Sequence, residues 1–152
     1  MRRILLVLIA TLIPATSFAG VPFEATLEEM AQGADHILIG RVTGVDMIDG
    51  RGRPIRDRKT MTGPGLKNTI RLLVAVDEVL ITNAASVPKV LAVPLASHLH
   101  YNLGQITDAH AGDTTARLAL LQKNFVGIKP GVFMRPVSDK DEALRIYHAT
   151  HP

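Results

Sequence analysis

Cysteine and tryptophan are absent from the 152 residues, and only two tyrosines and four phenylalanines are present. Without cysteine the chain can form no disulfide, thiolate metal site, cysteine nucleophile or lipoprotein-type acyl anchor. With so few aromatic rings it has little on which a nucleic-acid base could stack, and little with which to line a small-molecule pocket. The domain must therefore be held together by core packing, and neither nucleic acid nor a small molecule is the expected ligand.

Recognisable catalytic motifs are missing as well. The segment TGPGLKNT, residues 62–69, lacks the spacing of a phosphate-binding loop, and Pro64 removes an N–H that such a loop would need. There is no G-x-S-x-G motif, and Ser97 and the adjacent His98 would point to opposite faces of a strand. Because no nucleophile is paired with a base, the sequence predicts a protein that is not an enzyme and that needs no cofactor.

The first 19 residues have the three parts of a secretory signal peptide. MRR supplies positive charge, ILLVLIATLI an apolar core, and PATSFAG a helix breaker followed by small residues. The apolar run is shorter than the about 20 residues that span a bilayer. We therefore predict that residues 1–19 are cleaved, and that residues 20–152 form a single periplasmic or secreted domain without a membrane anchor.

Removal of the signal also changes the charge of the protein. Arg2 and Arg3 leave with it, so 17 basic residues become 15 against 14 acidic ones, and the net charge falls from +3 to +1. A domain so close to neutral has no general attraction for nucleic acid or anionic lipid. Electrostatic recognition would have to come from a local patch.

A short helix and two long strands are predicted in the first half of the domain. Thr26 and Glu29 have the spacing of a capping box at the start of the helix. Residues 36–48 and 69–82 are β-branched and apolar, with alternating faces, as is typical of strands. Two glycines inside the first strand predict a bend or a bulge there.

Two further strands, a hairpin and a helix are predicted in the second half. Residues 89–95 form a strand in which Pro94 cannot donate a ladder hydrogen bond, so the proline indicates an edge strand or the end of a strand. Residues 116–122 form another strand, and a short hairpin with Gly131 as its turn residue follows. The last helix is predicted over residues 139–148.

Together these elements predict a mainly β fold. The favoured architecture is a small antiparallel OB-like barrel of about five strands, with a short N-terminal helix and a C-terminal helix. The alternative is an open α+β sheet with both helices on one face.

A resemblance supports the barrel. The runs LEEMAQGADHILIGRVTGV and IRLLVAVDEVL, within residues 26–82, resemble the opening of small secreted bacterial domains of the OB-like or netrin/tissue-inhibitor-like barrel type. The chain is also similar to exported proteobacterial proteins, a likeness that implies no activity. The cysteines typical of netrin and inhibitor modules are missing here, so the resemblance implies the fold and assigns no functional residue.

Three of the six histidines lie in the segment SHLHYNLGQITDAH, residues 97–110. If the preceding strand continued this far, His98 and His100 would point to one face, and His110 or Asp108 could complete a zinc, copper or nickel site. If the strand ends at the preceding proline, the segment is an exposed loop without convergent geometry. The second interpretation is favoured, because the proline interrupts the strand.

The long connection formed by residues 49–68 contains a basic segment. Arginine side chains suit carboxylate and phosphate partners, so the segment could dock an acidic protein or lipid headgroups. The alternative is a solvated loop that is kept soluble by its charge. The five cations are Arg51, Arg53, Arg56, Arg58 and Lys59, against only Asp57 among them.

The leading functional hypothesis is a soluble periplasmic binding domain without catalytic activity, which contacts a protein partner through loops 49–68 and 97–115. Inhibitor-type binding falls within this class. The alternative hypothesis is a metal-binding periplasmic protein that uses His98, His100 and His110 to hold zinc or copper.

Overall fold

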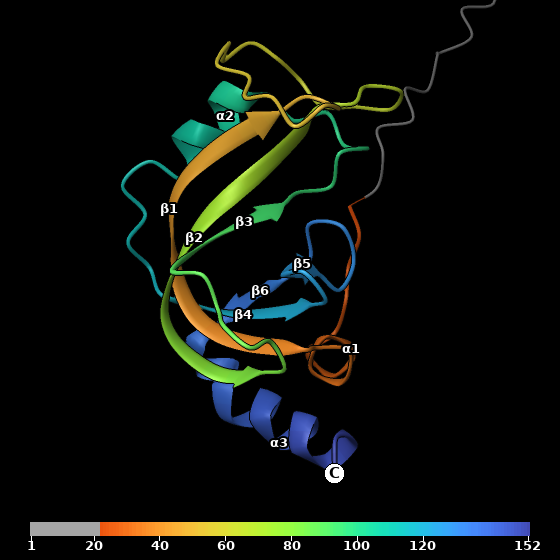
Figure 1. The fold of residues 1–152 in the computed structure, drawn as a ribbon, viewed down its shortest axis with the longest axis vertical. Coiled ribbons are helices and arrows are strands. Elements are labelled where there is room, and N and C mark those ends of the chain that lie inside the picture. The colour runs from red at the N-terminus through yellow and green to blue at the C-terminus, as the bar shows by residue number, and fades with distance from the viewer. Residues whose placement is uncertain (1–21) are drawn as a thin grey trace, which may run out of the picture.

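The computed structural model describes residues 22–152, and the predicted signal peptide lies outside them. The described chain forms one antiparallel sheet and two terminal helices, with a further helix between them (Figure 1). The predicted mainly β class and both terminal helices are therefore confirmed. In chain order the elements are α1 (Leu27–Gln32), β1 (His36–Ile48), β2 (Thr69–Thr82), β3 (Val90–Pro94), α2 (Leu103–Ala109), β4 (Arg117–Gln122), β5 (Val126–Gly127), β6 (Met134–Pro136), the 3-10 helix η1 (Val137–Asp139) and α3 (Lys140–Thr150).

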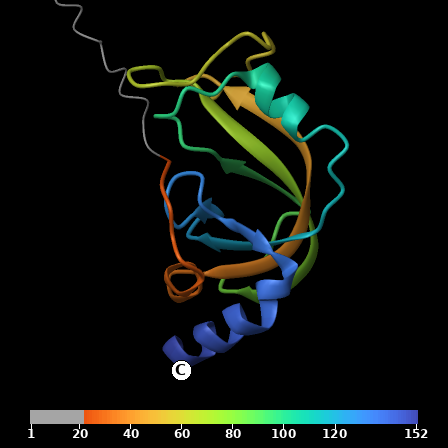
Figure 2. The ribbon, with the colours of Figure 1, turned by 180° about the vertical axis from the view of Figure 1, so that it is seen from behind.

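The long strands β1 and β2 form the spine of the sheet. They pair with each other along their whole length, β3 pairs with the first half of β2, and β4 pairs with the first five residues of β1. The resulting order is β3-β2-β1-β4-β5, and β6 also pairs with β4. Because β1 and β2 bend strongly, the two halves of the sheet wrap around a common interior (Figures 1 and 2).

The predicted irregularity in the first strand is confirmed at both glycines. The register of β1 against β2 shifts at Gly40 and again between Val42 and Gly44. A Cβ at Gly40 would lie 2.5 Å from the carbonyl oxygen of Ala75, so only glycine permits this approach. The shifts also break the alternation of faces, because Val42 and Val45 pack in the same hydrophobic cluster although they are three positions apart.

The favoured closed barrel is wrong, and the open sheet that was the alternative is correct. The edge strands β3 and β5 come within 8 Å of each other without pairing. Pro94 lacks an N–H and was therefore predicted to mark an edge strand or a strand end; it is the last residue of the edge strand β3. The chain after β5 turns back on itself at Gly131, where Val132 N bonds to Lys129 O at 2.9 Å and Ile128 N bonds to Val132 O at 3.1 Å. The predicted hairpin is thus present, and its backbone groups pair internally instead of closing the barrel.

Apolar side chains fill the interior of the bent sheet and the contact between the sheet and the terminal helices. The predicted capping box begins α1, with Thr26 N donating to Glu29 Oε2 at 2.8 Å and Glu29 N donating to Thr26 Oγ1 at 3.1 Å. Helices α1 and α3 pack against each other, and both cover the face of the sheet opposite the interior. The interior cluster is Leu38, Val42, Leu72, Val74, Leu91, Val93, Ala119, Leu121 and Phe133, and the helix-side cluster is Met30, Ala31, Ala34, Ile37, Leu118, Leu120, Ala143 and Ile146.

The segment expected to be one loop, residues 97–115, contains α2. Asn102 caps this helix through its side-chain oxygen, which accepts from Gln105 N at 3.1 Å. Leu103 then packs in a third cluster with Met47 and Ile70. The helix covers one end of the sheet, beside loop 49–68 (Figures 1 and 2).

Candidate functional site

The three candidate metal ligands lie in three different surroundings. The ring of His98 makes an edge-to-face contact with Phe23 at 4.9 Å between centroids. His100 lies over Gly63, where an added Cβ would be 3.1 Å from its Cε1 atom. His110 ends α2, and its buried Nδ1 has no hydrogen-bond partner among the described residues. In the part of the chain that the structure describes, no three histidine, aspartate or glutamate side chains are grouped so that they could hold a metal ion, so the predicted ligands are not brought together.

The basic segment of loop 49–68 is held against α2 and the residues that precede it. Gly104 N donates to Arg58 O at 2.8 Å, and Leu103 N donates to Thr60 O at 3.0 Å. The buried Thr62 adds a hydroxyl bond of 2.6 Å to a carbonyl of the same neighbouring segment. A Cβ at Gly104 would lie 3.1 Å from Arg58 O, which explains a glycine inside the first turn of α2. The loop is therefore ordered before it meets any partner.

Asp49 organises the turn at the start of the loop. Its carboxylate accepts from Arg53 N at 3.0 Å, from Arg53 Nε at 2.8 Å and from Arg51 N at 2.8 Å. These hydrogen bonds, those of Arg53 above all, hold the pKa of Asp49 below its ordinary value. The Lys67 side chain lies directly over Gly50, where an added Cβ would meet it at 2.8 Å. The turn thus packs against the aliphatic part of the Lys67 side chain.

Arg51 and Arg56 differ from every other arginine in residues 22–152. Both are exposed, and neither forms an ion pair with any described residue. Lys59 and Lys67, in the same loop, are likewise exposed and unpaired within the described chain. Every remaining arginine of this range has a carboxylate partner at 2.6–3.0 Å: Arg41 with Asp77, Arg53 with Asp49, Arg58 with Asp108, Arg71 with Asp46, Arg117 with Asp113, Arg135 with Asp139 and Arg145 with Glu142.

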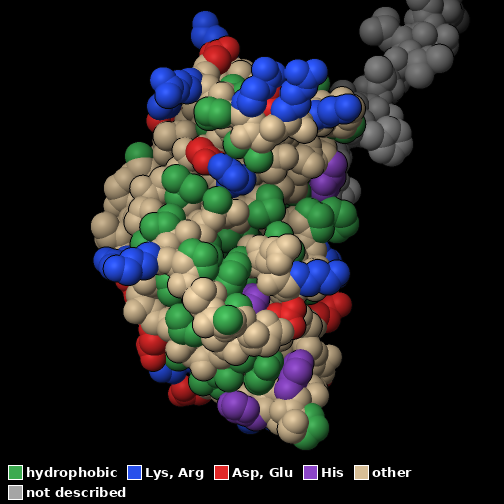
Figure 3. Space-filling view, viewed as in Figure 1, with side chains coloured by type: hydrophobic (Ala, Val, Ile, Leu, Met, Phe, Trp, Pro, Cys, Tyr) green, Lys and Arg blue, Asp and Glu red, His purple; other side chains and the backbone are tan. Residues whose placement is uncertain are grey.

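Positive charge is concentrated at the end of the molecule that loop 49–68 forms (Figure 3). The loop contains six basic and two acidic residues, a net charge of +4. The rest of residues 22–152 contains nine basic and twelve acidic residues, a net charge of −3. The near-neutral total therefore hides a strong separation of charge, and this end of the molecule would attract an anionic partner.

A cavity of about 320 Å³ lies between the loop and α2. Arg56 and Arg58 border it, and most of the other lining side chains are apolar. Asp46 also borders it, but its carboxylate is engaged by Arg71 through hydrogen bonds of 2.8 and 2.6 Å. The complete lining is Val45, Asp46, Met47, Pro54, Ile55, Arg56, Arg58, Leu103 and Thr107.

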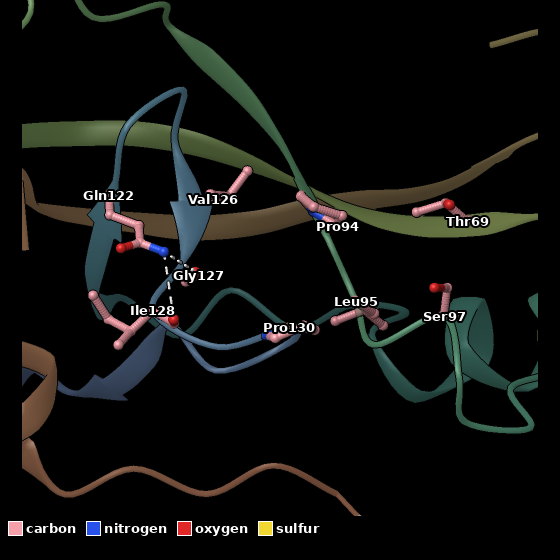
Figure 4. A pocket seen from close by; sticks show the side chains of 9 residues that line it. All are labelled: Thr69, Pro94, Leu95, Ser97, Gln122, Val126, Gly127, Ile128 and Pro130. Atoms are coloured by element: carbon pink, nitrogen blue, oxygen red, sulfur yellow. Dashed lines mark hydrogen bonds between the residues drawn. The ribbon is translucent and has the colours of Figure 1, made fainter. Parts of the chain in front are cut away.

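A larger cavity of about 390 Å³ lies at the open edge of the sheet, between the end of β3 and β5 (Figure 4). The side-chain amide nitrogen of Gln122 donates hydrogen bonds to the carbonyl oxygens of Gly127 and Ile128, at 3.3 and 3.4 Å. Among residues 22–152, no ionisable side chain lines this cavity, so it offers apolar contacts and the hydroxyls of two residues. The lining residues are Thr69, Pro94, Leu95, Ser97, Gln122, Val126, Gly127, Ile128 and Pro130.

A third cavity of about 350 Å³ is bordered by Arg41, His110 and Asp113. Arg41 makes two hydrogen bonds to a neighbouring carboxylate, which raise its pKa further above neutrality. The backbone N–H of Thr115 and the guanidinium of Arg117 hold the pKa of Asp113 well below its usual range. Both charged groups are therefore satisfied within the protein, in contrast to Arg51 and Arg56.

No family model, curated protein or solved structure matches this chain. The resemblance to exported OB-like domains therefore stays a prediction, and the site has to be judged from its own geometry. Among the helices of residues 22–152, none has the length and apolar character that a transmembrane span requires.

Two parts of this site were not predicted from the sequence. One is α2, whose N-cap residue Asn102 was the available signal. The other is the cavity between α2 and the loop, for which the sequence carries no signal because its walls come from three separate segments.

Proposed function

We propose that this protein is a binding domain without catalytic activity, and that it contacts a partner protein through loop 49–68 and the neighbouring helix α2. The observation that carries the proposal is the contrast between the unpaired Arg51 and Arg56 and the ion-paired arginines elsewhere in the described chain. Because the sequence predicts an export signal, we propose that the binding takes place in the periplasm or outside the cell.

The energetics of arginine ion pairs support a binding role for Arg51 and Arg56. An exposed ion pair contributes at most about 1 kcal/mol to folding, so Arg51 and Arg56 sacrifice little stability by having no partner. At an interface, where a partner carboxylate can meet both donors of the guanidinium side by side and water is excluded, the same side chain contributes more. Because the loop is held by backbone hydrogen bonds to α2, little conformational entropy is lost when it binds.

Quantitative affinity capture from periplasmic extract tests this proposal. The bait proteins are the wild type, the double variant Arg51→Glu/Arg56→Glu and the matched control Lys89→Glu/Lys140→Glu. Lys89 and Lys140 also lack an ion pair among the described residues and lie outside the loop, so the control makes the same change in net charge. Each captured protein is then purified and its affinity for the three baits is measured.

We expect at least one protein to bind the wild type and the control with equal affinity, and to bind the loop variant about tenfold more weakly or worse. The proposal is overturned if no captured protein binds after purification, or if the loop variant and the control bind it equally well.

A further inference from the structure

Arg56 and Arg58 both border the cavity between loop 49–68 and α2. Arg56 has no carboxylate partner in residues 22–152, and Arg58 uses only its Nη2 atom, which bonds to Asp108 at 2.6 Å and to Gly104 O at 3.4 Å. Donors of both guanidinium groups therefore remain for an incoming anion. Asp46 in the lining does not oppose an anion strongly, because Arg71 neutralises it.

Most of the other side chains that line this cavity are apolar. Leu103 is a buried member of the third hydrophobic cluster, and Ile55 and Val45 are partly buried side chains that pack against this cluster. At about 320 Å³ the cavity lies at the lower end of the range known for ligand pockets, which suits one large side chain better than a cofactor. Met61 and Leu66, 41% and 52% exposed, add further apolar surface on the same loop.

From this combination we infer that the partner presents an acidic segment with an apolar residue at its centre. The apolar side chain enters the cavity between the loop and α2, and the carboxylates on either side of it bind Arg56 and Arg58. This inference rests on the proposed function and specifies the chemistry of the partner. It goes beyond charge attraction, because the cavity selects the residue that the acidic groups flank.

A protein segment fits the site better than an anionic membrane. Loop 49–68 contains no aromatic residue, whereas tyrosine and tryptophan are the side chains that anchor proteins at a lipid interface. A recess that two cations border matches a single protruding side chain beside carboxylates, which a peptide supplies and a layer of headgroups does not.

Fluorescence anisotropy with three labelled peptides tests the inference. The probes are EEDLDEE, its analogue EEDGDEE without the apolar side chain, and its analogue QQNLNQQ without charge; vesicles of phosphatidylglycerol and phosphatidylcholine are the membrane arm. The protein variants are Arg56→Glu, Thr107→Phe, which fills the cavity from α2, and Gln105→Phe, which adds the same ring on α2 outside the cavity lining. The unfolding midpoint of each variant is measured to confirm that it folds.

We expect EEDLDEE to bind the wild type about tenfold or more tightly than EEDGDEE, because only the first peptide buries an apolar side chain. QQNLNQQ should not bind, and Arg56→Glu should weaken the binding of EEDLDEE about tenfold or more. Thr107→Phe should remove the advantage of EEDLDEE over EEDGDEE, whereas Gln105→Phe should retain it.

Three results would overturn the inference. Equal binding of EEDLDEE and EEDGDEE, or an unchanged preference in Thr107→Phe, would exclude the cavity as the recognition site. Vesicle binding that depends on Arg56, without peptide binding, would assign the surface to a membrane instead. If no peptide binds while capture of a partner protein still depends on Arg51 and Arg56, only this inference fails. If no peptide binds and no captured protein depends on Arg51 and Arg56, the proposed function fails as well.

Discussion

Arg58 and Asp108, 50 positions apart in the sequence, form an ion pair of 2.6 Å that joins loop 49–68 to α2. Both side chains are largely exposed, at 57% and 70%, so the pair is screened by water and salt. Its position matters more than its strength, because it fixes Arg58 at the border of the cavity.

Asp108→Asn should therefore loosen the loop without unfolding the protein. We expect the free energy of unfolding to fall by less than about 1 kcal/mol. Amide hydrogen exchange should become faster at Thr62, Leu103 and Gly104, whose N–H groups donate across the contact between the loop and the segment that contains α2. Asp141→Asn on α3 is the control, and equal exchange rates in the two variants would contradict this role for the pair.

The two glycines of β1 should respond differently to substitution by alanine. At Gly40 the new Cβ would lie 2.5 Å from Ala75 O and 2.9 Å from Val74 Cγ1, whereas at Gly44 the nearest atom is 3.5 Å away. Gly40→Ala should lower the free energy of unfolding by about 1–3 kcal/mol or more, because the paired strand must move. Gly44→Ala should change it by less than about 0.5 kcal/mol. Urea denaturation measures both, and similar losses would contradict the geometry.

His36 is 1% exposed, and both of its ring nitrogens form hydrogen bonds within the protein. Its Nε2 donates to Lys123 O at 2.8 Å, which leaves Nδ1 to accept from the Thr82 hydroxyl at 2.9 Å, and its ring stacks on Phe125 at 4.3 Å. His36→Ala would remove both of these partly buried hydrogen bonds and leave a cavity in place of the ring. We expect a loss of about 2–4 kcal/mol of unfolding free energy.

The exposed His148 is the control for this substitution. His148→Ala should change the free energy of unfolding by less than about 0.5 kcal/mol. An equally small effect of His36→Ala would show that the hydrogen bonds of His36 are dispensable.

Acid should destabilise the protein partly through Asp113. Because its pKa in the folded protein is held far below its value in the unfolded chain, the ionised carboxylate contributes stability above about pH 4. That contribution is lost as the pH falls toward the folded pKa, so the unfolding midpoint should decline below about pH 4. Asp113→Asn keeps an acceptor for Thr115 N but cannot titrate, and its midpoint should therefore decline less steeply. Parallel curves for the wild type and the variant would rule out this source of acid sensitivity.

Local features of the chain were predictable wherever a short-range physical rule applied. The capping box of Thr26 and Glu29 depends only on residues three apart, and the strand periodicity of residues 36–48 and 69–82 depends only on which side chains avoid water. Pro94 identified an edge because its missing N–H excludes it from a ladder on both sides. The two glycines predicted an irregularity in β1, but which face each side chain after Gly44 occupies was not predictable, because a register shift moves the later side chains to the other face.

The sequence by itself determined the mainly β class, the two terminal helices and the cluster of basic residues in loop 49–68. Only the tertiary structure decided that the sheet stays open, since closure depends on whether β3 and β5, far apart in the chain, can align their backbone groups. The structure also decided which arginines of the loop are free. Arg53 and Arg58 meet Asp49 and Asp108, whereas Arg51 and Arg56 meet no carboxylate within residues 22–152. Ion pairing depends on distances of a few ångströms between side chains that the fold brings together, and such distances cannot be read from the order of residues.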